Sequence, residues 1–190
     1  MCDYDIIKHC SPTLAGMKCG SMFSVLHESK EELWEDLKNL NKMFSKRGLC
    51  MIPLRTEGDH TLVYLYRPAQ LSACLSKPEA AKLLQEKGYP CGQTARSLVC
   101  LIKHLRQDKQ FPHEIGLFLD YPAEDVRGFM EGQAQSKCVG TYRVYGDEKA
   151  AAKTFAKYKK CQKIYDKVFK EGRSLEQLTV ASRGVQCAEF

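Results

Sequence analysis

Residues 9–23 read HCSPTLAGMKCGSMF, and no other stretch of the chain combines a histidine, a thiol, a helix-start signal and two glycines so closely. The pair Ser11 and Pro12 predicts the start of a helix, because serine caps free backbone amides and proline in a first turn loses no hydrogen bond. The glycines that follow predict a short helix. We therefore expect residues 4–9 to form a short strand or an extended lead-in, and residues 21–26 to form the first core strand.

The thiol of Cys10 is the strongest candidate for a reactive group. A cysteine just before a helix start lies near unpaired amides and the positive end of the helix dipole, which favours the nucleophilic thiolate. His9 is a poor base for it, because adjacent residues in an extended chain point to opposite sides. His113 is the better candidate, and Glu114 could orient it. The alternative is that Cys10 is a small core residue and His113 a surface residue in a first helical turn.

Ligand binding is predicted only in outline. The polar and aromatic residues within or beside these motifs are candidate binding residues: His9, Ser11, Thr13, Lys18 and Tyr121. The sequence has no phosphate-binding or dinucleotide-binding glycine motif. It also has no close C-x-x-C pair, so no zinc knuckle is predicted. A metal site assembled from distant residues, or haem ligation by histidine or cysteine, stays open as an alternative.

Length and composition are typical of one globular domain. A chain of 190 residues can bury about 70% of the surface that its unfolded form exposes. No segment approaches the roughly 18 consecutive apolar residues that a membrane helix needs, and the N-terminus does not read as a signal peptide. We expect a cytoplasmic protein whose ten cysteines are mostly reduced. Residues 1–181 are predicted to form a single domain, and residues 182–190 a loose tail.

Helices and strands alternate along the chain. A capping box at Ser29 and a glycine stop at Gly48 frame one helix, and a glycine turn at residues 57–60 predicts a hairpin. Strands are expected over 21–26, 49–56, 61–67 and 138–145, and helices from Ser76, from Thr94, over 112–119, over 122–131, after Gly146 and Asp147, and over 174–177. This order predicts an α/β (α+β) domain with a small, mainly antiparallel sheet of about four strands, several flanking helices and a long amphipathic C-terminal helix.

The positive charge of the chain is concentrated in that last long helix. Residues 146–173 hold nine lysines and arginines against four acidic residues, a surplus of five in a net charge of +6. Tyr158 and Tyr165 fall on its apolar stripe, where they could not stack on bases, so nucleic acid is not an expected partner. The lysines predict a solvated face, and an acidic partner stays open.

Several motifs occur in a fixed order: HCSPTLAG at 9–16, FPHEIGLFL at 111–119, residues 121–129 with Tyr-Pro, Glu-Asp-Val and Gly-Phe, CVG at 138–140, and VYGD at 144–147. They resemble an uncharacterised bacterial family, catalogued as domain of unknown function thirty-seven ninety-three and found mainly in anaerobic Firmicutes. The resemblance covers nearly the whole chain. The resemblance implies no established activity. Members of the family are often encoded near ferrous-iron transport and flavodoxin genes, which favours an iron, haem or redox role.

Two residues depart from the pattern of that family. Asp120 stands where glycine is expected, and Thr141 where an aromatic residue or cysteine is common. Aspartate tolerates left-handed backbone, so we expect the turn at residue 120 to persist.

The leading functional hypothesis is thiol-dependent hydrolysis, transfer or redox chemistry at Cys10 with His113. A non-enzymatic iron- or haem-binding protein is the first alternative, and an interaction module that uses the lysine-rich helix is the second. The sequence leaves open whether the protein is an enzyme.

Overall fold

The structure is a computed structural model, and it describes residues 1–90, 92–107, 110–133 and 135–182. Its chain divides into two units. Unit 1 comprises residues 1–70 and 160–190, and unit 2 comprises residues 71–159. The single domain over residues 1–181 stays a prediction. The predicted tail lies outside the described residues except for Ser182.

Unit 1 is built on three antiparallel strands in the order β1-β3-β2: β1 (Gly20–Leu26), β2 (Cys50–Glu57) and β3 (His60–Tyr66). Phe23 pairs with Val63, so their side chains lie on the same face of the sheet. The tight turn between β2 and β3 depends on Gly58, whose φ of 58° is left-handed. The three strands confirm those predicted over 21–26, 49–56 and 61–67.

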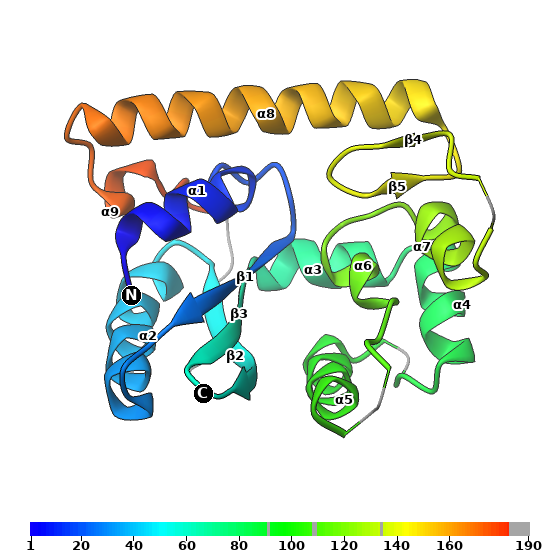
Figure 1. Ribbon diagram of the computed structural model, residues 1–190, viewed down its shortest axis with the longest axis horizontal. Coiled ribbons are helices and arrows are strands. Elements are labelled where there is room, and N and C mark those ends of the chain that lie inside the picture. The colour runs from blue at the N-terminus through cyan, green and yellow to red at the C-terminus, as the bar shows by residue number, and fades with distance from the viewer. Residues whose placement is uncertain (91, 108–109, 134, 183–190) are drawn as a thin grey trace. The chain divides into compact units, whose positions relative to one another are not determined.

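Two helices pack against this sheet, α1 (Asp3–Leu14) on β1 and α2 (Lys30–Ser45) on β2 (Figure 1). The capping box at the start of α2 is present in part, because the Ser29 hydroxyl accepts a hydrogen bond from the Glu32 amide at 3.1 Å. Apolar side chains from both helices and from one face of the sheet form a shared core: Ile6, Ile7, Cys10, Leu14, Phe23, Val25, Leu33, Leu37, Phe44, Leu49, Met51, Val63, Leu65 and Leu175.

The prediction for the N-terminus is wrong. Residues 4–9 are not extended, and the helix begins at Asp3 rather than at Ser11. Asp3 and Asp5 lie in its first turn, where carboxylates stabilise the positive end of the helix dipole. Pro12 lies inside the helix near its end, so its missing amide costs one hydrogen bond but does not prevent the helix from forming before it.

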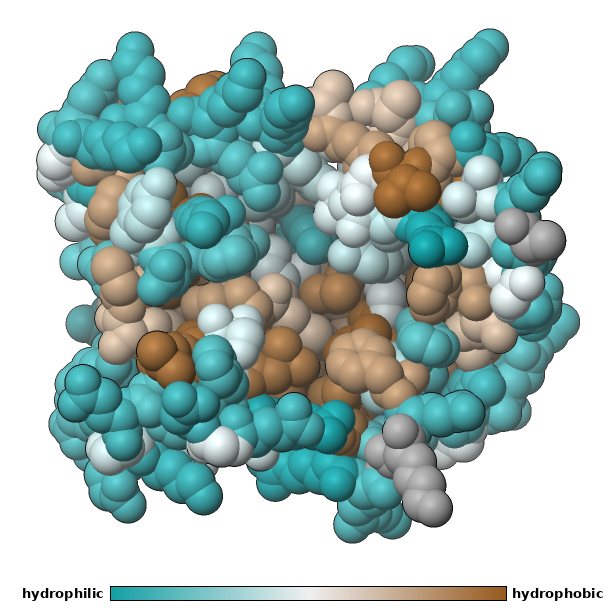
Figure 2. Space-filling view, viewed as in Figure 1, coloured by the Kyte–Doolittle hydropathy of each residue, from teal (hydrophilic) through white to brown (hydrophobic). Residues whose placement is uncertain are grey.

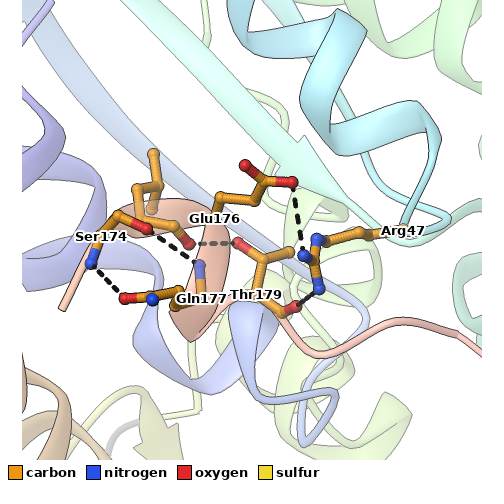
Figure 3. A network of polar contacts seen from close by, with 6 residues as sticks. Arg47, Ser174, Glu176, Gln177 and Thr179 are labelled. Atoms are coloured by element: carbon orange, nitrogen blue, oxygen red, sulfur yellow. Dashed lines mark hydrogen bonds and ion pairs between the residues drawn. The ribbon is translucent and has the colours of Figure 1, made fainter.

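The C-terminal segment of unit 1 is held by a polar network (Figure 3). Helix α9 (Leu175–Leu178) begins with a capping box, in which Ser174 and Gln177 exchange side-chain and backbone hydrogen bonds. Arg47, which follows α2, donates to the Thr179 carbonyl at 2.9 Å and reaches Glu176 at 3.4 Å. These contacts confirm the short helix predicted over 174–177.

Unit 2 is mostly helical. Helix α3 (Pro68–Leu75) contains the boundary at which the chain enters this unit, and the helices that follow are α4 (Pro78–Glu86), α5 (Thr94–Gln107), α6 (Ile115–Phe118) and α7 (Ala123–Met130). Helices α4, α5 and α7 confirm the helices predicted from Ser76, from Thr94 and over 122–131. Helix α6 is shorter than the helix predicted over 112–119, and α3 is not among the predicted helices. Their buried apolar residues supply the core of the unit, among them Leu83, Leu84, Leu98, Leu101, Leu105, Leu117, Phe118 and Val126.

Residues 138–145 do not form the single strand that their alternation predicts. They form two short paired strands, β4 (Cys138–Val139) and β5 (Arg143–Val144). The chain turns at Gly140, where any side chain would collide with Phe155. Asp125 anchors this hairpin to α7, because its carboxylate accepts hydrogen bonds from the amides of Tyr145 and Gly146 at 2.6 and 2.8 Å.

The long C-terminal helix is α8 (Glu148–Lys170). The predicted cap is confirmed, since the Asp147 carboxylate accepts a hydrogen bond from the Ala150 amide at 3.0 Å. Hydrophilic side chains project from this helix at the top of Figure 2, consistent with the predicted lysine-rich face. None of the helices in the described ranges is both long enough and apolar enough to cross a membrane.

Candidate functional site

Cys10 lies in the interior of unit 1, in the third turn of α1, with 0% of its surface exposed. Burial raises the pKa of its thiol far above the usual range, and the positive charge of Lys18 offsets only part of that effect. The physical premise of the sequence-based hypothesis, a thiolate beside a helix start, is therefore absent. Cys10 belongs to unit 1 and His113 to unit 2, so their pairing stays a prediction.

The other N-terminal candidates contact neighbouring residues of unit 1. The His9 ring stacks on Phe23 at 5.3 Å, and burial lowers the His9 pKa. Thr13 is fully buried, and its hydroxyl shares a hydrogen bond of 2.8 Å with Ser21. Ser11 donates to the Ile7 carbonyl within its own helix. Lys18 is also buried. Binding roles for His9, Ser11, Thr13 and Lys18 stay predictions.

Adjacent residues His113 and Glu114 have separate surroundings. His113 is exposed, and its ring meets the edge of Phe129 at 4.8 Å between centroids. Glu114 is buried, and its carboxylate accepts a hydrogen bond of 2.9 Å from the Tyr89 hydroxyl. The same carboxylate oxygen lies 3.5 Å from His104 Nδ1. The histidine that lies next to the Glu114 carboxylate in space is therefore His104, and not its sequence neighbour His113.

His104 connects this carboxylate to a thiol. Cys100 and His104 are four residues apart on α5, so their side chains lie on the same face of the helix. Cys100 Sγ lies 3.7 Å from His104 Nε2, a hydrogen-bond distance for sulfur. On the other side of the ring, His104 Nδ1 lies 3.2 Å from the Tyr89 hydroxyl. Tyr89, Cys100, His104 and Glu114 form what we call the α5 cluster.

Local structure explains how Tyr89 reaches the α5 cluster. Helix α4 ends at Glu86, and Gly88 just beyond it has a left-handed φ of 79°, so that the chain reverses and the Tyr89 amide donates to the Leu84 carbonyl at 3.0 Å. The Tyr89 ring then meets His104 edge-on at 5.1 Å and is 3% exposed. Tyr89 therefore holds the imidazole in place as well as hydrogen-bonding to it.

Hydrogen bonding in the α5 cluster assigns the tautomer of His104. The single hydroxyl hydrogen of Tyr89 is donated to Glu114, so the hydroxyl oxygen can only accept from His104 Nδ1. The imidazole hydrogen is thereby placed on Nδ1. The lone pair of Nε2 faces Cys100 Sγ, which is the orientation that a general base for this thiol requires.

The side chains of the cluster differ in how much of their surface is exposed to solvent. The side chain of Glu114 is 8% exposed and that of His104 is 25% exposed, and Cys100 is half-buried. A buried carboxylate next to the Nδ1 side of a histidine stabilises the imidazolium that forms when Nε2 takes a proton. The arrangement therefore places a half-buried thiol beside an imidazole whose other side faces a buried carboxylate.

The sequence contains part of this signal. Cys100 and His104 show a C-x-x-x-H spacing inside a predicted helix, which places them side by side, and sequence reasoning passed over it. Nothing in the sequence indicates that Tyr89 and Glu114 join them, because both come from loops outside α5. Only the fold brings the four residues together.

A cavity of about 280 Å³ lies elsewhere in unit 2. Tyr121, a predicted binding residue, lines it together with Cys74, Lys77, Asp120 and Glu124. The Cys74 thiol donates to the Asp120 carboxylate at 3.0 Å, and the Lys77 ammonium lies 3.7 Å from the same oxygen. Asp120 is thus already partnered inside the cavity, and a binding role for Tyr121 stays a prediction.

Fold and site together define a small protein with an antiparallel sheet, several helices and a cysteine–histidine pair on α5 whose histidine lies beside the Glu114 carboxylate. The chain belongs to the family described as protein of unknown function (DUF3793), whose family model matches residues 6–179. This match confirms the resemblance seen in the motifs. No curated protein and no solved structure matches the chain.

Proposed function

We propose that this protein is a thiol-dependent hydrolase or acyltransferase in which Cys100 is the nucleophile and His104 its general base. The observation that supports the proposal is the 3.7 Å contact between Cys100 Sγ and His104 Nε2. Tyr89 and Glu114 are positioning residues, because they act through the imidazole and not on the reacting atoms. The site carried over from sequence, Cys10 with His113, is the alternative.

The proposed reaction begins with transfer of the Cys100 proton to His104 Nε2. The thiolate attacks an acyl carbon and forms a thioester, while the leaving group departs with the proton from Nε2. Water, or a second nucleophile in a transfer reaction, then attacks the thioester and regenerates the thiol. Acyl transfer uses the histidine first as base and then as acid, which fits a held imidazole better than thiol–disulfide exchange does, since exchange requires only a thiolate.

Site-resolved alkylation tests the base. The native protein is treated with iodoacetamide between about pH 5 and pH 9, and the labelling rate of each cysteine is read by mass spectrometry. We expect Cys100 to react fast near pH 6, and His104→Asn to slow it by about 10- to 100-fold. His113→Asn is the matched control, because this histidine is exposed and its ring contacts the rings of Phe111 and Phe129. A Cys100 rate that does not change in His104→Asn contradicts the proposal.

An acylation assay tests the chemistry itself. With p-nitrophenyl acetate as substrate, we expect an acetylated Cys100 peptide in the wild-type protein and none in Cys100→Ser. Glu114→Gln and Tyr89→Phe should lower the acetylation rate and shift its pH dependence, whereas a merely structural role would leave the pH dependence unchanged. Acetylation that requires Cys10 and His113 instead would support the alternative pair.

The iron or haem hypothesis is tested separately. Elemental analysis and an absorption spectrum of the purified protein, before and after incubation with ferrous iron or haem, report binding directly. A stoichiometric chromophore or metal content that disappears in Cys100→Ser would replace the nucleophile proposal with a binding role for the same thiol.

A further inference from the structure

Helix α5 itself carries basic side chains and no acidic ones. Between Thr94 and Gln107 the helix contains Arg96, Lys103 and Arg106 and no aspartate or glutamate. Arg96 and Lys103 are both exposed, and within the described part of the chain neither has a carboxylate within ion-pair distance. A helix face of this kind attracts anions, because no neighbouring negative charge on the helix neutralises it.

The two cations lie directly beside the proposed nucleophile. With 3.6 residues per turn, Arg96 and Lys103 are displaced from Cys100 by about 40° and about 60° in one direction around the helix, and His104 by about 40° in the other. Arg96 precedes Cys100 by four residues and Lys103 follows it by three, so both are surface neighbours of the thiol. Cys100 is thus bracketed by its base on one side and by two positive charges on the other.

An exposed apolar side chain completes this surface. Val99 is 67% exposed, and it lies three residues after Arg96 and four before Lys103, between the two cations on the helix surface. An electrophile that reaches Cys100 from this side meets a small apolar contact with a positive charge at each end. That combination suits a molecule with an apolar body and a negatively charged group.

We infer that the substrate of the Cys100 site is an anionic electrophile, which carries a carboxylate or phosphate group that Arg96 and Lys103 bind beside the thiol. This inference rests on the proposed function, because it assigns the substrate class of the same nucleophile. Positive charge next to the thiol has two consistent effects. It concentrates the anion at the site, and it stabilises the thiolate that attacks.

A charge series of disulfide probes tests the substrate class. Dithiobis-nitrobenzoate is anionic, dithiodipyridine is neutral and cystamine is cationic. In each case the thiolate attacks a disulfide sulfur, the S–S bond breaks, and one half leaves as a thiolate while the other forms a mixed disulfide with the protein. The rate at Cys100 is read by mass spectrometry for each probe. At low ionic strength we expect the order anionic, neutral, cationic, relative to the rates of the same probes with free cysteine.

The variant Arg96→Gln/Lys103→Gln isolates the two cations. We expect it to lower the anionic-to-neutral rate ratio by about three- to tenfold. The rate with the neutral probe reports the loss of thiolate stabilisation separately, and dividing by it removes that effect from the ratio. Raising the salt concentration from about 0.02 M to about 0.5 M should remove the same preference from the wild-type protein. Arg106→Gln is the matched control, because it removes the same charge from the same helix about 120° around from Cys100.

The outcomes separate the two proposals. If Cys100 reacts with the neutral probe but the anionic-to-neutral ratio is the same in wild type and the double variant, the substrate class is wrong and the nucleophile proposal stands. An equal loss of that ratio in Arg106→Gln also overturns the inference, because the effect would then come from the charge of the whole unit. If Cys100 reacts with no probe near neutral pH, both proposals fail together.

Discussion

Asp120 adopts a left-handed backbone with a φ of 60° and is the one residue other than glycine with positive φ among those the structure describes. The turn expected from the sequence therefore persists with aspartate in place of the glycine expected there. Two features favour aspartate at this position. Its short polar side chain tolerates left-handed backbone, and its carboxylate accepts the hydrogen bond of the Cys74 thiol.

Substitutions at residue 120 separate backbone strain from that hydrogen bond. We expect Asp120→Ala to lower the free energy of unfolding by about 1–3 kcal/mol, because it keeps the strain and loses the acceptor. Asp120→Gly loses the same acceptor but relieves the strain, so it should be more stable than Asp120→Ala by about 1 kcal/mol. Urea unfolding measures both values. Equal stability of the two variants would show that the left-handed backbone is not strained.

Arg67 is the largest charged side chain buried in unit 1, with 1% of its surface exposed. Its guanidinium donates to the carbonyls of Thr13, Leu14 and Val180 and to the Ser182 hydroxyl, each at 2.7 Å. Burial lowers the pKa of Arg67. The guanidinium therefore joins the end of α1 to the segment after α9, two segments that lie far apart in the sequence.

A lysine cannot replace this fork. We expect Arg67→Lys to lower the free energy of unfolding by about 2–4 kcal/mol, because the ammonium keeps the charge but cannot reach four acceptors at once. Arg55→Lys is the matched control, since Arg55 is partly exposed and pairs with Glu57, and its change should stay within about 0.5 kcal/mol. Guanidinium unfolding of the two variants and wild type makes the comparison. Similar losses in both variants would refute a special role for Arg67.

Elements form where the sequence predicts them when periodicity and end signals agree. Helix α2 has an apolar repeat, a serine cap and a glycine stop, and its observed bounds match that pattern. Helix α1 was misjudged because the Ser11–Pro12 signal is local, whereas burial of Ile6, Ile7 and Cys10 against the sheet decides the conformation. The α5 cluster follows the same rule. Sequence places Cys100 and His104 on one helix, but tertiary packing brings Glu114 to them.

Helix α8 carries two groups whose neutral forms the folded state favours. Burial raises the pKa of the Cys161 thiol to about 11 and that of Tyr165 to about 12. In the unfolded chain these groups ionise near their ordinary pKa values of 9.0 and 10.0. Between those values and the folded ones, the unfolded state holds fewer protons than the folded state, so stability falls as pH rises.

We therefore expect these two groups, together with the buried Cys10 thiol, to make the free energy of unfolding decline as the pH rises above about 9. Tyr165→Phe removes one of the two groups and should reduce this decline, by about 1 kcal/mol because the half-buried ring is partly screened by solvent. Chemical denaturation at about pH 8 and pH 11 makes the comparison, and the lower pH serves as the internal control. A decline as steep in Tyr165→Phe as in wild type would exclude Tyr165 as its source.

In the whole molecule, the candidate reactive thiol belongs to one unit and the buried thiols belong to the other. Unit 2 is formed by a continuous segment inserted between the two segments of unit 1, and all four residues of the α5 cluster lie within it. Among the described residues, three cysteine thiols are buried, and all three belong to unit 1: Cys10, Cys19 and Cys161. The rates at which these thiols are alkylated should therefore report the unfolding of unit 1, and not the reactivity of a catalytic group.

Cys10 offers the sharpest form of that test. Because it is fully buried in the core shared by α1, α2 and the sheet, we expect its labelling to require unfolding of unit 1. Its rate should rise with urea along the same slope as the unfolding equilibrium, while exposed Cys2 labels at a rate nearly independent of urea below the transition. If Cys10 instead labels quickly in the native protein at a urea-independent rate, its thiol is accessible without unfolding. That result would restore Cys10 as a candidate nucleophile, and a comparison of His113→Asn with His104→Asn would then show which histidine activates it.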